Sequence, residues 1–134
     1  LKYGEGQIPL LIATFEWEGE LFDVVLAHPK PPSAGSSFRQ RNELIADLAQ
    51  QDFPVPLIVA GDFNATPFSP PLRQLMSNLG LRDARKGFGW QPTWPASLSF
   101  IGIPIDYFLV SESIQVHTCK VGKPFGSDHL PLYA

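Results

Sequence analysis

Cysteine is nearly absent from this 134-residue sequence, and the single thiol of Cys119 cannot form an internal disulfide. We expect Cys119 to act as a small apolar side chain in a strand. Charge is also sparse, because only 17% of the residues are Asp, Glu, Lys or Arg and the formal net charge is −3. The basic residues are scattered, so the sequence does not predict the broad basic surface that non-specific binding to long nucleic acids requires.

Long apolar runs are missing as well. No stretch approaches the roughly 20 residues that a helix needs to cross a bilayer, and no signal-peptide pattern opens the chain. The sequence begins at Leu1 rather than at methionine, which leaves open a membrane anchor upstream in a longer parent protein. The sequence does not indicate a compartment.

Hydrophobic residues make up 44% of the chain, which predicts one compact domain with a packed core. Apolar runs at 9–17 and 21–28 predict a β-hairpin that is buried on both faces. Helices are predicted at 38–51 and from the N-cap Ser69 to the stop at Gly80. Further strands are predicted at 57–60, 105–111, 114–120 and 130–133. This order indicates an α+β fold with one mostly antiparallel sheet and helices on one face.

Four short segments hold most of the polar residues suited to chemistry, and each lies at or near a predicted strand end. They contain His28, the run Gly61-Asp62-Phe63-Asn64, Asp106, and the run Ser127-Asp128-His129. Because several loops at one sheet edge can converge, we expect these side chains to form one site.

The segments LIVAGDFNATP at 57–67, PIDYFLVS at 104–111 and GSDHLPL at 126–132 together resemble the endonuclease/exonuclease/phosphatase superfamily. VLAHP at 25–29 and the FRQRNELIADL helix support this resemblance, which covers most of the chain. It implies half of a four-layer α/β/β/α sandwich, in which residues 1–134 form the C-terminal half of the domain and the N-terminal half is absent. It also implies hydrolysis of a phosphoester with Mg²⁺ or Mn²⁺. The substrate is left open between a nucleic acid, a phospholipid head group and a small phosphoester.

Such hydrolysis needs a hard cation held by oxygen ligands, a base for water, and donors to the phosphoryl oxygens. Asp62 can orient or deprotonate the attacking water, or bind the metal. Asn64 offers an amide donor to a phosphate oxygen and is a further candidate metal ligand. The alternative for this pair is an Asx-turn, in which both side chains only satisfy amides of the loop.

The resemblance implies that His129 contacts the scissile phosphate and that Asp128 helps to bind the metal. Asp106 is the candidate carboxylate partner that keeps the imidazole of His129 protonated. The alternative is that Asp106 caps a strand or pairs with an arginine. His28 matches a second phosphate-contacting histidine, and its alternative is a strand-end histidine without a role.

Other residues favour structural roles. Arg39 and Arg41 are interpreted as part of a solvated helix face rather than as phosphate ligands. Trp94 and Phe100 are interpreted as core or rim packing rather than as platforms for stacked bases.

The principal metal ligand of the resembled family is a glutamate in the N-terminal half, and no glutamate here has that sequence context. Two interpretations therefore stand. The parent is a metal-dependent phosphodiesterase or nuclease-like hydrolase, and this chain alone is incomplete, inactive or weak. Alternatively, the chain is a non-catalytic association module or an excised fragment. In both, an exposed apolar sheet face is expected to pair with the missing half or with a second copy in a homodimer.

Overall fold

The computed structural model describes residues 10–134, so residue 9 of the first predicted strand lies outside the described part. The elements are β1 (Leu11–Trp17), β2 (Glu20–Leu26), α1 (Gly35–Leu48), β3 (Leu57–Asp62), α2 (Pro70–Asn78), β4 (Leu81–Asp83), the 3₁₀ turn η1 (Ala96–Ile101), β5 (Asp106–Ser111), β6 (Lys120–Val121) and β7 (Leu132–Tyr133). Neither helix in residues 10–134 has the length and apolarity needed to span a bilayer.

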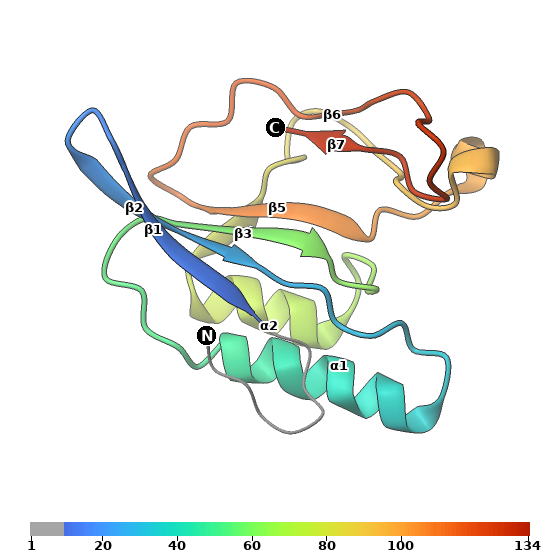
Figure 1. Ribbon diagram of the computed structural model, residues 1–134, viewed down its shortest axis with the longest axis horizontal. Coiled ribbons are helices and arrows are strands. Elements are labelled where there is room, and N and C mark those ends of the chain that lie inside the picture. Colours follow the sequence, from blue (N-terminus) through green and yellow to red (C-terminus); the bar gives the residue numbers. More distant parts are fainter. Residues whose placement is uncertain (1–9) are drawn as a thin grey trace.

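The main sheet has five strands in the order β1-β2-β3-β5-β4. Within this sheet, β2 and β3 run parallel, and α1 forms the crossover connection that joins a parallel pair. The other neighbouring strands are antiparallel. Both helices cover one face of this sheet (Figure 1). The predicted α+β fold, with a mostly antiparallel sheet and helices on one face, is confirmed.

The prediction of a single sheet is wrong in its details. β6 and β7 form a separate two-stranded sheet, and within residues 114–120 only Lys120 is in a strand. Residues 114–117 alternate between apolar and polar, but strand formation also needs a cross-strand partner, and the described ladder pairs only Lys120 and Val121 with β7. The short edge strand β4 was missed, since three residues carry too little periodicity to predict a strand.

The core lies between the main sheet and the two helices. Its fully buried side chains include Val25, Leu57, Val59, Tyr107 and Leu109 from the sheet, Phe63 from the loop after β3, Ile45 and Leu48 from α1, and Leu72 and Leu75 from α2. The hydroxyl of Tyr107 donates toward two carbonyl oxygens, those of Ala65 at 2.8 Å and Pro104 at 2.9 Å. A buried hydroxyl needs such partners, and these two fix the loop after β3 against the segment that leads into β5.

The opposite face of the hairpin is exposed. Leu11 pairs with Leu26 and Phe15 pairs with Phe22, so these four side chains share one face, and Trp17 lies on it as well. The core residue Val25 points to the other face. We call Leu11, Phe15, Trp17, Phe22 and Leu26 the outer sheet face.

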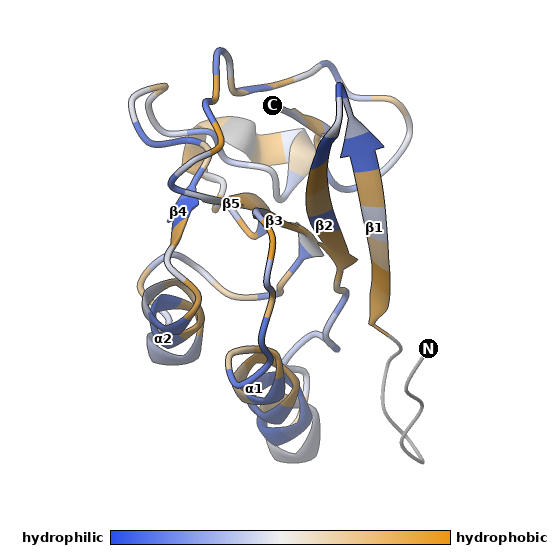
Figure 2. Ribbon diagram, turned by 90° about the vertical axis from the view of Figure 1, so that its left-hand side faces the viewer, coloured by the Kyte–Doolittle hydropathy of each residue, from blue (hydrophilic) through white to orange (hydrophobic). Residues whose placement is uncertain are grey.

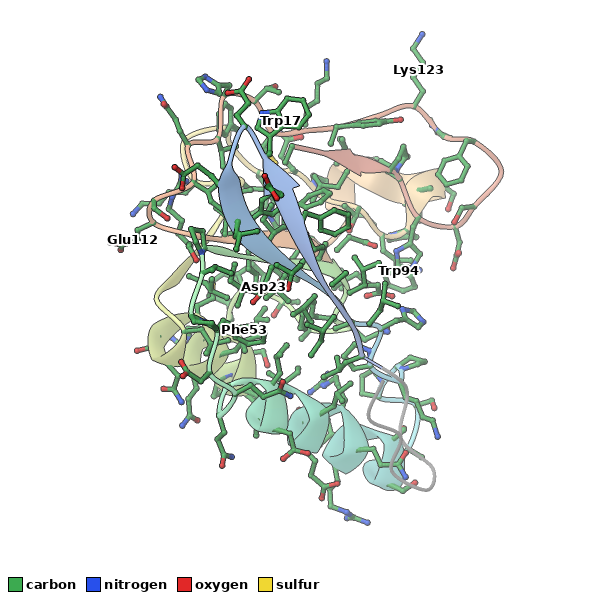
Figure 3. The ribbon with its side chains drawn as sticks, turned by 60° about the vertical axis from the view of Figure 1, so that its left-hand side comes forward. Trp17, Asp23, Phe53, Trp94, Glu112 and Lys123 are labelled. Carbon is green, nitrogen blue, oxygen red and sulfur yellow. The ribbon has the colours of Figure 1, made fainter. Side chains whose placement is uncertain are left out.

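β1 and β2 are hydrophobic along most of their length (Figure 2), and Trp17 stands near the hairpin tip (Figure 3). Leu11, Phe15, Trp17 and Leu26 are exposed, so the prediction that both faces of the hairpin are buried is wrong. The helices cover only the face that carries Val25, and β6 and β7 lie on the other side of the main sheet, where most hairpin residues of the outer sheet face remain exposed (Figure 1).

Candidate active site

The pairing of β3 with β5 brings the two carboxylates Asp62 and Asp106 together. Asp62 ends β3, Asp106 begins β5, and the antiparallel register places them directly opposite each other. The amide of Phe63 donates to the carbonyl of Ile105 at 2.9 Å, which extends the pairing past the end of β3. Two residues that are distant in the sequence therefore occupy one edge of the sheet, at the right-hand end in Figure 1.

His129 lies between these carboxylates. Its Nδ1 is 2.8 Å from Oδ2 of Asp106, and its Nε2 is 3.9 Å from Oδ2 of Asp62. Burial lowers the pKa of His129, but the hydrogen bond and the negative charge of Asp106 outweigh burial, so the net pKa is raised. With Nδ1–H donated to Asp106, the protonated ring presents its Nε2–H toward Asp62 and the space in front of it.

The loop after β3 holds Asp62 through an Asx-turn. The backbone N–H of Asn64 donates to Oδ1 of Asp62 at 2.8 Å, and the side-chain Nδ2 of Asn64 donates to Oδ2 at 3.2 Å. The same Nδ2 donates to the carbonyl of Pro29 at 3.0 Å, which links this loop to the end of β2. Asn64 adopts φ 48°, a value that asparagine tolerates better than most residues.

The pKa of the Asp62 carboxyl is raised, first because burial disfavours its charge. The Asn64 amide opposes this shift, Asp106 adds to it by repulsion, and His129 and His28 oppose it. A carboxylate with a raised pKa is a stronger base than an exposed one and is suited to accepting a proton from water.

The remaining candidates lie around the same cleft. His28 is exposed, with Nδ1 3.8 Å from Oδ2 of Asp62. Asp128 is exposed, and its Oδ2 is 3.4 Å from Nε1 of Trp94. The cleft has a volume of about 590 Å³ and is lined by His28, Pro31, Pro32, Ser33, Asp62, Asn64, Trp94, Ile103, Ile105, Asp128 and His129. Of the six predicted site residues, only Asp106 is not part of this lining, and it contacts the lining residue His129.

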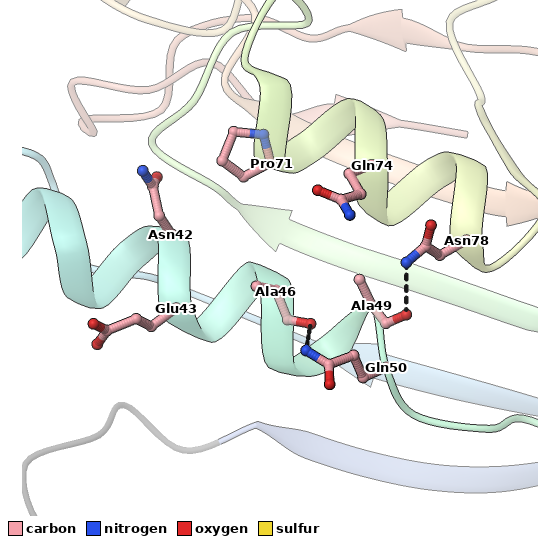
Figure 4. Close-up of a pocket in the computed structure, with 8 residues that line it drawn as sticks. All are labelled: Asn42, Glu43, Ala46, Ala49, Gln50, Pro71, Gln74 and Asn78. Carbon is pink, nitrogen blue, oxygen red and sulfur yellow. Dashed lines mark hydrogen bonds between the residues drawn. The ribbon is translucent and has the colours of Figure 1, made fainter.

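A different cavity, of about 320 Å³, lies between α1 and α2 (Figure 4). Its wall contains four amide side chains, two alanines, Pro71 and Glu43, and Asn78 donates to the carbonyl of Ala49 at 3.4 Å across it. None of the candidate residues lines this cavity, and Glu43 is its only ionisable lining residue.

Arg41 has a structural role that the sequence interpretation missed. It is buried rather than solvated, and its Nη1 donates to the carbonyl oxygen of Asn64 at 2.7 Å. Arg41 therefore helps to fix the loop that carries Asp62. Little in the sequence indicated that Arg41 is buried, because an arginine on an amphipathic helix is usually exposed.

Phe100 also departs from its interpretation as a packing residue. It is 82% exposed, whereas Trp94 is 39% exposed and forms part of the cleft rim.

The donors at the cleft are hard oxygens, of the type that Mg²⁺ and Mn²⁺ prefer. However, residues 10–134 contain no group of three or more His, Cys, Asp or Glu side chains arranged to hold a metal ion. The oxygen donors of the cleft are nevertheless of the chemical type that binds a divalent cation.

The model of the Endonuclease/Exonuclease/phosphatase family matches residues 3–129. The chain therefore belongs to this family of phosphoester hydrolases. The sequence matches no curated protein.

Solved structures show the same fold. A Beutenbergia cavernae endonuclease/exonuclease/phosphatase is 25% identical, with a TM-score of 0.74, and the match covers 92% of this chain and 37% of that one. The human nocturnin catalytic domain with bound sulfate is 27% identical, with a TM-score of 0.58 and coverages of 86% and 46%. A Staphylococcus aureus beta toxin mutant with bound magnesium ions is 16% identical, with a TM-score of 0.55 and coverages of 90% and 55%. The chain thus spans between about a third and about half of the length of these structures.

Proposed function

We propose that the chain carries the water-activating and phosphate-contacting half of a divalent-metal-dependent phosphoesterase site. The observation that supports this most directly is the position of His129 between two carboxylates, 2.8 Å from Asp106 and 3.9 Å from Asp62, beside an open cleft. An imidazolium held in this way can donate a hydrogen bond to a negatively charged phosphoryl oxygen. The neighbouring carboxylate of Asp62 can accept a proton from water.

Asp62 is assigned to orient and deprotonate the attacking water. Its raised pKa and the two hydrogen bonds from Asn64 support this role, because they combine basicity with a fixed orientation. Asn64 acts first by positioning Asp62. Donation from Asn64 to a phosphoryl oxygen requires its Nδ2 to exchange one of its present partners, Asp62 or the Pro29 carbonyl.

His129 is assigned to stabilise the charge that develops on the phosphoryl group through Nε2–H, and Asp106 orients the ring through Nδ1. His28 contributes a second donor. Its 65% exposed side chain, close to Asp62, leaves it free to turn toward a substrate phosphate.

For the metal we propose Mg²⁺ or Mn²⁺, held by Asp128 with support from Asp62 and Asn64 and completed by a carboxylate from outside residues 10–134. The membership in a family of phosphoester hydrolases supports this assignment, as do the magnesium ions bound in the beta toxin structure. When bound, such an ion polarises the phosphoryl oxygens and lowers the pKa of water. The substrate class is a phosphoester, with nucleic acid, lipid head group and small ester as its candidates.

The test is hydrolysis of bis-p-nitrophenyl phosphate and of plasmid DNA by the complete parent protein, with Mg²⁺, Mn²⁺ or EDTA. We expect metal-dependent turnover that falls by about 100-fold or more in Asp62→Asn and in His129→Gln. Asp52→Asn, at an exposed position that does not line the cleft, is the matched control and should keep its activity. Unchanged turnover in either cleft variant would overturn the assignment.

A second candidate is that the chain is the C-terminal half of a domain and acts as an association module, through the outer sheet face, with the other half or with a second copy. The exposure of Leu11, Phe15 and Trp17 favours it, because contiguous exposed apolar surfaces mark interaction sites. A parent protein that shows no metal-dependent turnover, together with a chain that pairs through this face, would support this candidate over the first.

A further inference from the structure

Thr93 is a buried polar residue beside the cleft that the proposed site does not use. It is fully buried, although the next residue, Trp94, lines the cleft. A buried hydroxyl needs hydrogen-bond partners, and Oγ1 of Thr93 accepts from two backbone amides, those of Ile105 at 3.2 Å and Asp106 at 3.3 Å. The hydroxyl of Thr93 therefore holds the backbone where β5 begins, at the residue whose carboxylate contacts His129.

The backbone of Thr93 acts on the other partner of this contact. Its carbonyl oxygen accepts from the amide of Leu130 at 2.7 Å, directly after His129 in the chain. Three residues beyond Thr93, the amide of Ala96 donates to the carbonyl of Asp128 at 2.8 Å, directly before His129. The chain on each side of His129 is thus hydrogen-bonded to the short segment that begins with Thr93.

Within residues 10–134, strand pairing does not join the two parts of the fold that Thr93 contacts. Asp106 belongs to the main sheet, whereas His129 precedes β7 of the separate sheet, on the side of the main sheet away from the helices (Figure 1). The separation of Asp106 and His129 then depends on contacts outside the strands. Thr93 supplies one hydrogen-bonded attachment to each part, through its hydroxyl and through its carbonyl.

We propose that Thr93 is a positioning residue for the 2.8 Å contact between Asp106 and His129. Without its hydroxyl, two backbone amides at the start of β5 lose their acceptor in a buried environment, which favours a shift of this backbone toward other partners. Thr93 does not line the cleft, so it acts through the pair and not through the substrate. The effect on turnover rests on the proposed phosphoesterase function, whereas the effect on the pair does not.

The experiment compares Thr93→Val with Thr93→Ser in the complete parent protein. Valine keeps the shape of threonine without the hydroxyl, whereas serine keeps the hydroxyl and loses a buried methyl group. The first readout is the low-field proton NMR resonance of Nδ1–H of His129, which is identified by its absence in His129→Gln. We expect this resonance to be lost in Thr93→Val and retained in Thr93→Ser.

The second readout is turnover of bis-p-nitrophenyl phosphate by the same variants. Because a small displacement of a group that contacts the reacting phosphate slows the chemical step, kcat should fall by about tenfold or more in Thr93→Val, with a smaller change in KM. Thr93→Ser should recover most of the lost kcat, since it restores the acceptor for both amides.

The matched control is Thr14→Val, which removes a hydroxyl that donates to Oδ1 of Asp23 at 2.6 Å, at a position that does not line the cleft. We expect it to lower the thermal stability and to leave the resonance and kcat unchanged. If the resonance and kcat instead follow thermal stability in all three variants, Thr93 contributes only stability and the proposal is overturned. Retention of the resonance in Thr93→Val overturns it as well.

Thr93→Cys covers the case in which Thr93→Val does not fold. It replaces the accepting oxygen with a sulfur, which is a weak acceptor. We expect a weakened resonance and a reduced kcat in this variant. Values equal to those of Thr93→Ser would overturn the proposal.

Failure of the enzyme proposal is a separate outcome. A resonance that is lost in Thr93→Val and kept in Thr93→Ser, in a parent protein without phosphoester turnover, would retain Thr93 as a positioning residue and refute the catalytic assignment. Turnover that is equal in Thr93→Val and in the unsubstituted parent, with the resonance kept, would retain the catalytic assignment and refute the role of Thr93.

Discussion

Nδ1 of His129 lies 2.8 Å from Oδ2 of Asp106, the shortest contact between two ionisable groups at the cleft edge. Asp106 sits on β5 in the main sheet, whereas His129 sits in the loop before β7 of the separate two-stranded sheet. The pair therefore joins the two sheets electrostatically. It also sets which ring nitrogen of His129 faces the cleft.

The pKa of His129 should be higher than the ordinary histidine value and should fall in Asp106→Asn. Asp106 provides both the hydrogen bond and the largest charge interaction that raise it. NMR titration of the imidazole resonance of His129 measures both values. An unchanged titration of His129 in Asp106→Asn would contradict the assigned pairing.

The same pair should make stability depend on pH in a defined direction. Because the folded pKa is raised, the folded state binds the proton more tightly than the unfolded state. The stabilising contribution is fully present below the unfolded pKa of about 6.5 and is lost as pH rises through the folded pKa. Urea unfolding at a series of pH values should show this loss in the unsubstituted chain and a smaller one in Asp106→Asn.

Arg41 should act as a positioning residue for the loop that carries Asp62. Replacing it in Arg41→Met removes the 2.7 Å hydrogen bond to the carbonyl oxygen of Asn64, and the free energy of unfolding should fall by about 1–3 kcal/mol. Arg39→Met, at an exposed position on the same helix, should change it by less than about 0.5 kcal/mol. Chemical denaturation monitors both variants, and equal effects would show that the Arg41 bond contributes nothing specific.

Gly61 should tolerate no side chain. A Cβ at this position would lie 1.9 Å from the carbonyl oxygen of Ala27 on the neighbouring chain segment, and φ is +139°. Gly61→Ala must therefore move the backbone next to Asp62, and we expect a loss of more than about 2 kcal/mol in the free energy of unfolding.

Gly35→Ala is the matched control for this substitution. Gly35 begins α1, has no atom within 4 Å of a built Cβ, and should change stability by no more than about 1 kcal/mol. A Gly61→Ala variant as stable as Gly35→Ala would disprove the steric argument.

The outer sheet face should drive association of the isolated chain. Phe15 stacks on Phe22 with ring centroids 5.7 Å apart, and both belong to this exposed apolar face. Sedimentation velocity should show a dimer or larger species, which Phe15→Asp converts to monomer because a buried, unpaired carboxylate is costly in such an interface. Glu18→Gln at the hairpin turn is a control that should not change the oligomeric state. A monodisperse monomer of the unsubstituted chain would contradict self-association.

Local sequence signals predicted the elements that have strong periodicity or clear terminators. The apolar run that ends in Gly61 predicted β3, and Pro70 after Ser69 predicted the start of α2. The strand β4 was not predicted, because its three residues are too few to show a periodic pattern. Residues 114–119 were predicted as part of a strand but are not in one, because the alternation of Ile114 and Val116 with polar residues is not matched by a partner strand.

The residue types and their order along the chain determined the α+β class, the family resemblance and the candidate residues Asp62, Asn64, Asp106, Asp128, His129 and His28. Those signals are local, since each depends on a few neighbouring residues. Only the tertiary structure decided that Asp62 faces Asp106, that Arg41 is buried against the Asn64 carbonyl, and that Phe15 and Phe100 are exposed. Strand register and burial depend on which distant segments pack together, and no short sequence pattern contains that information.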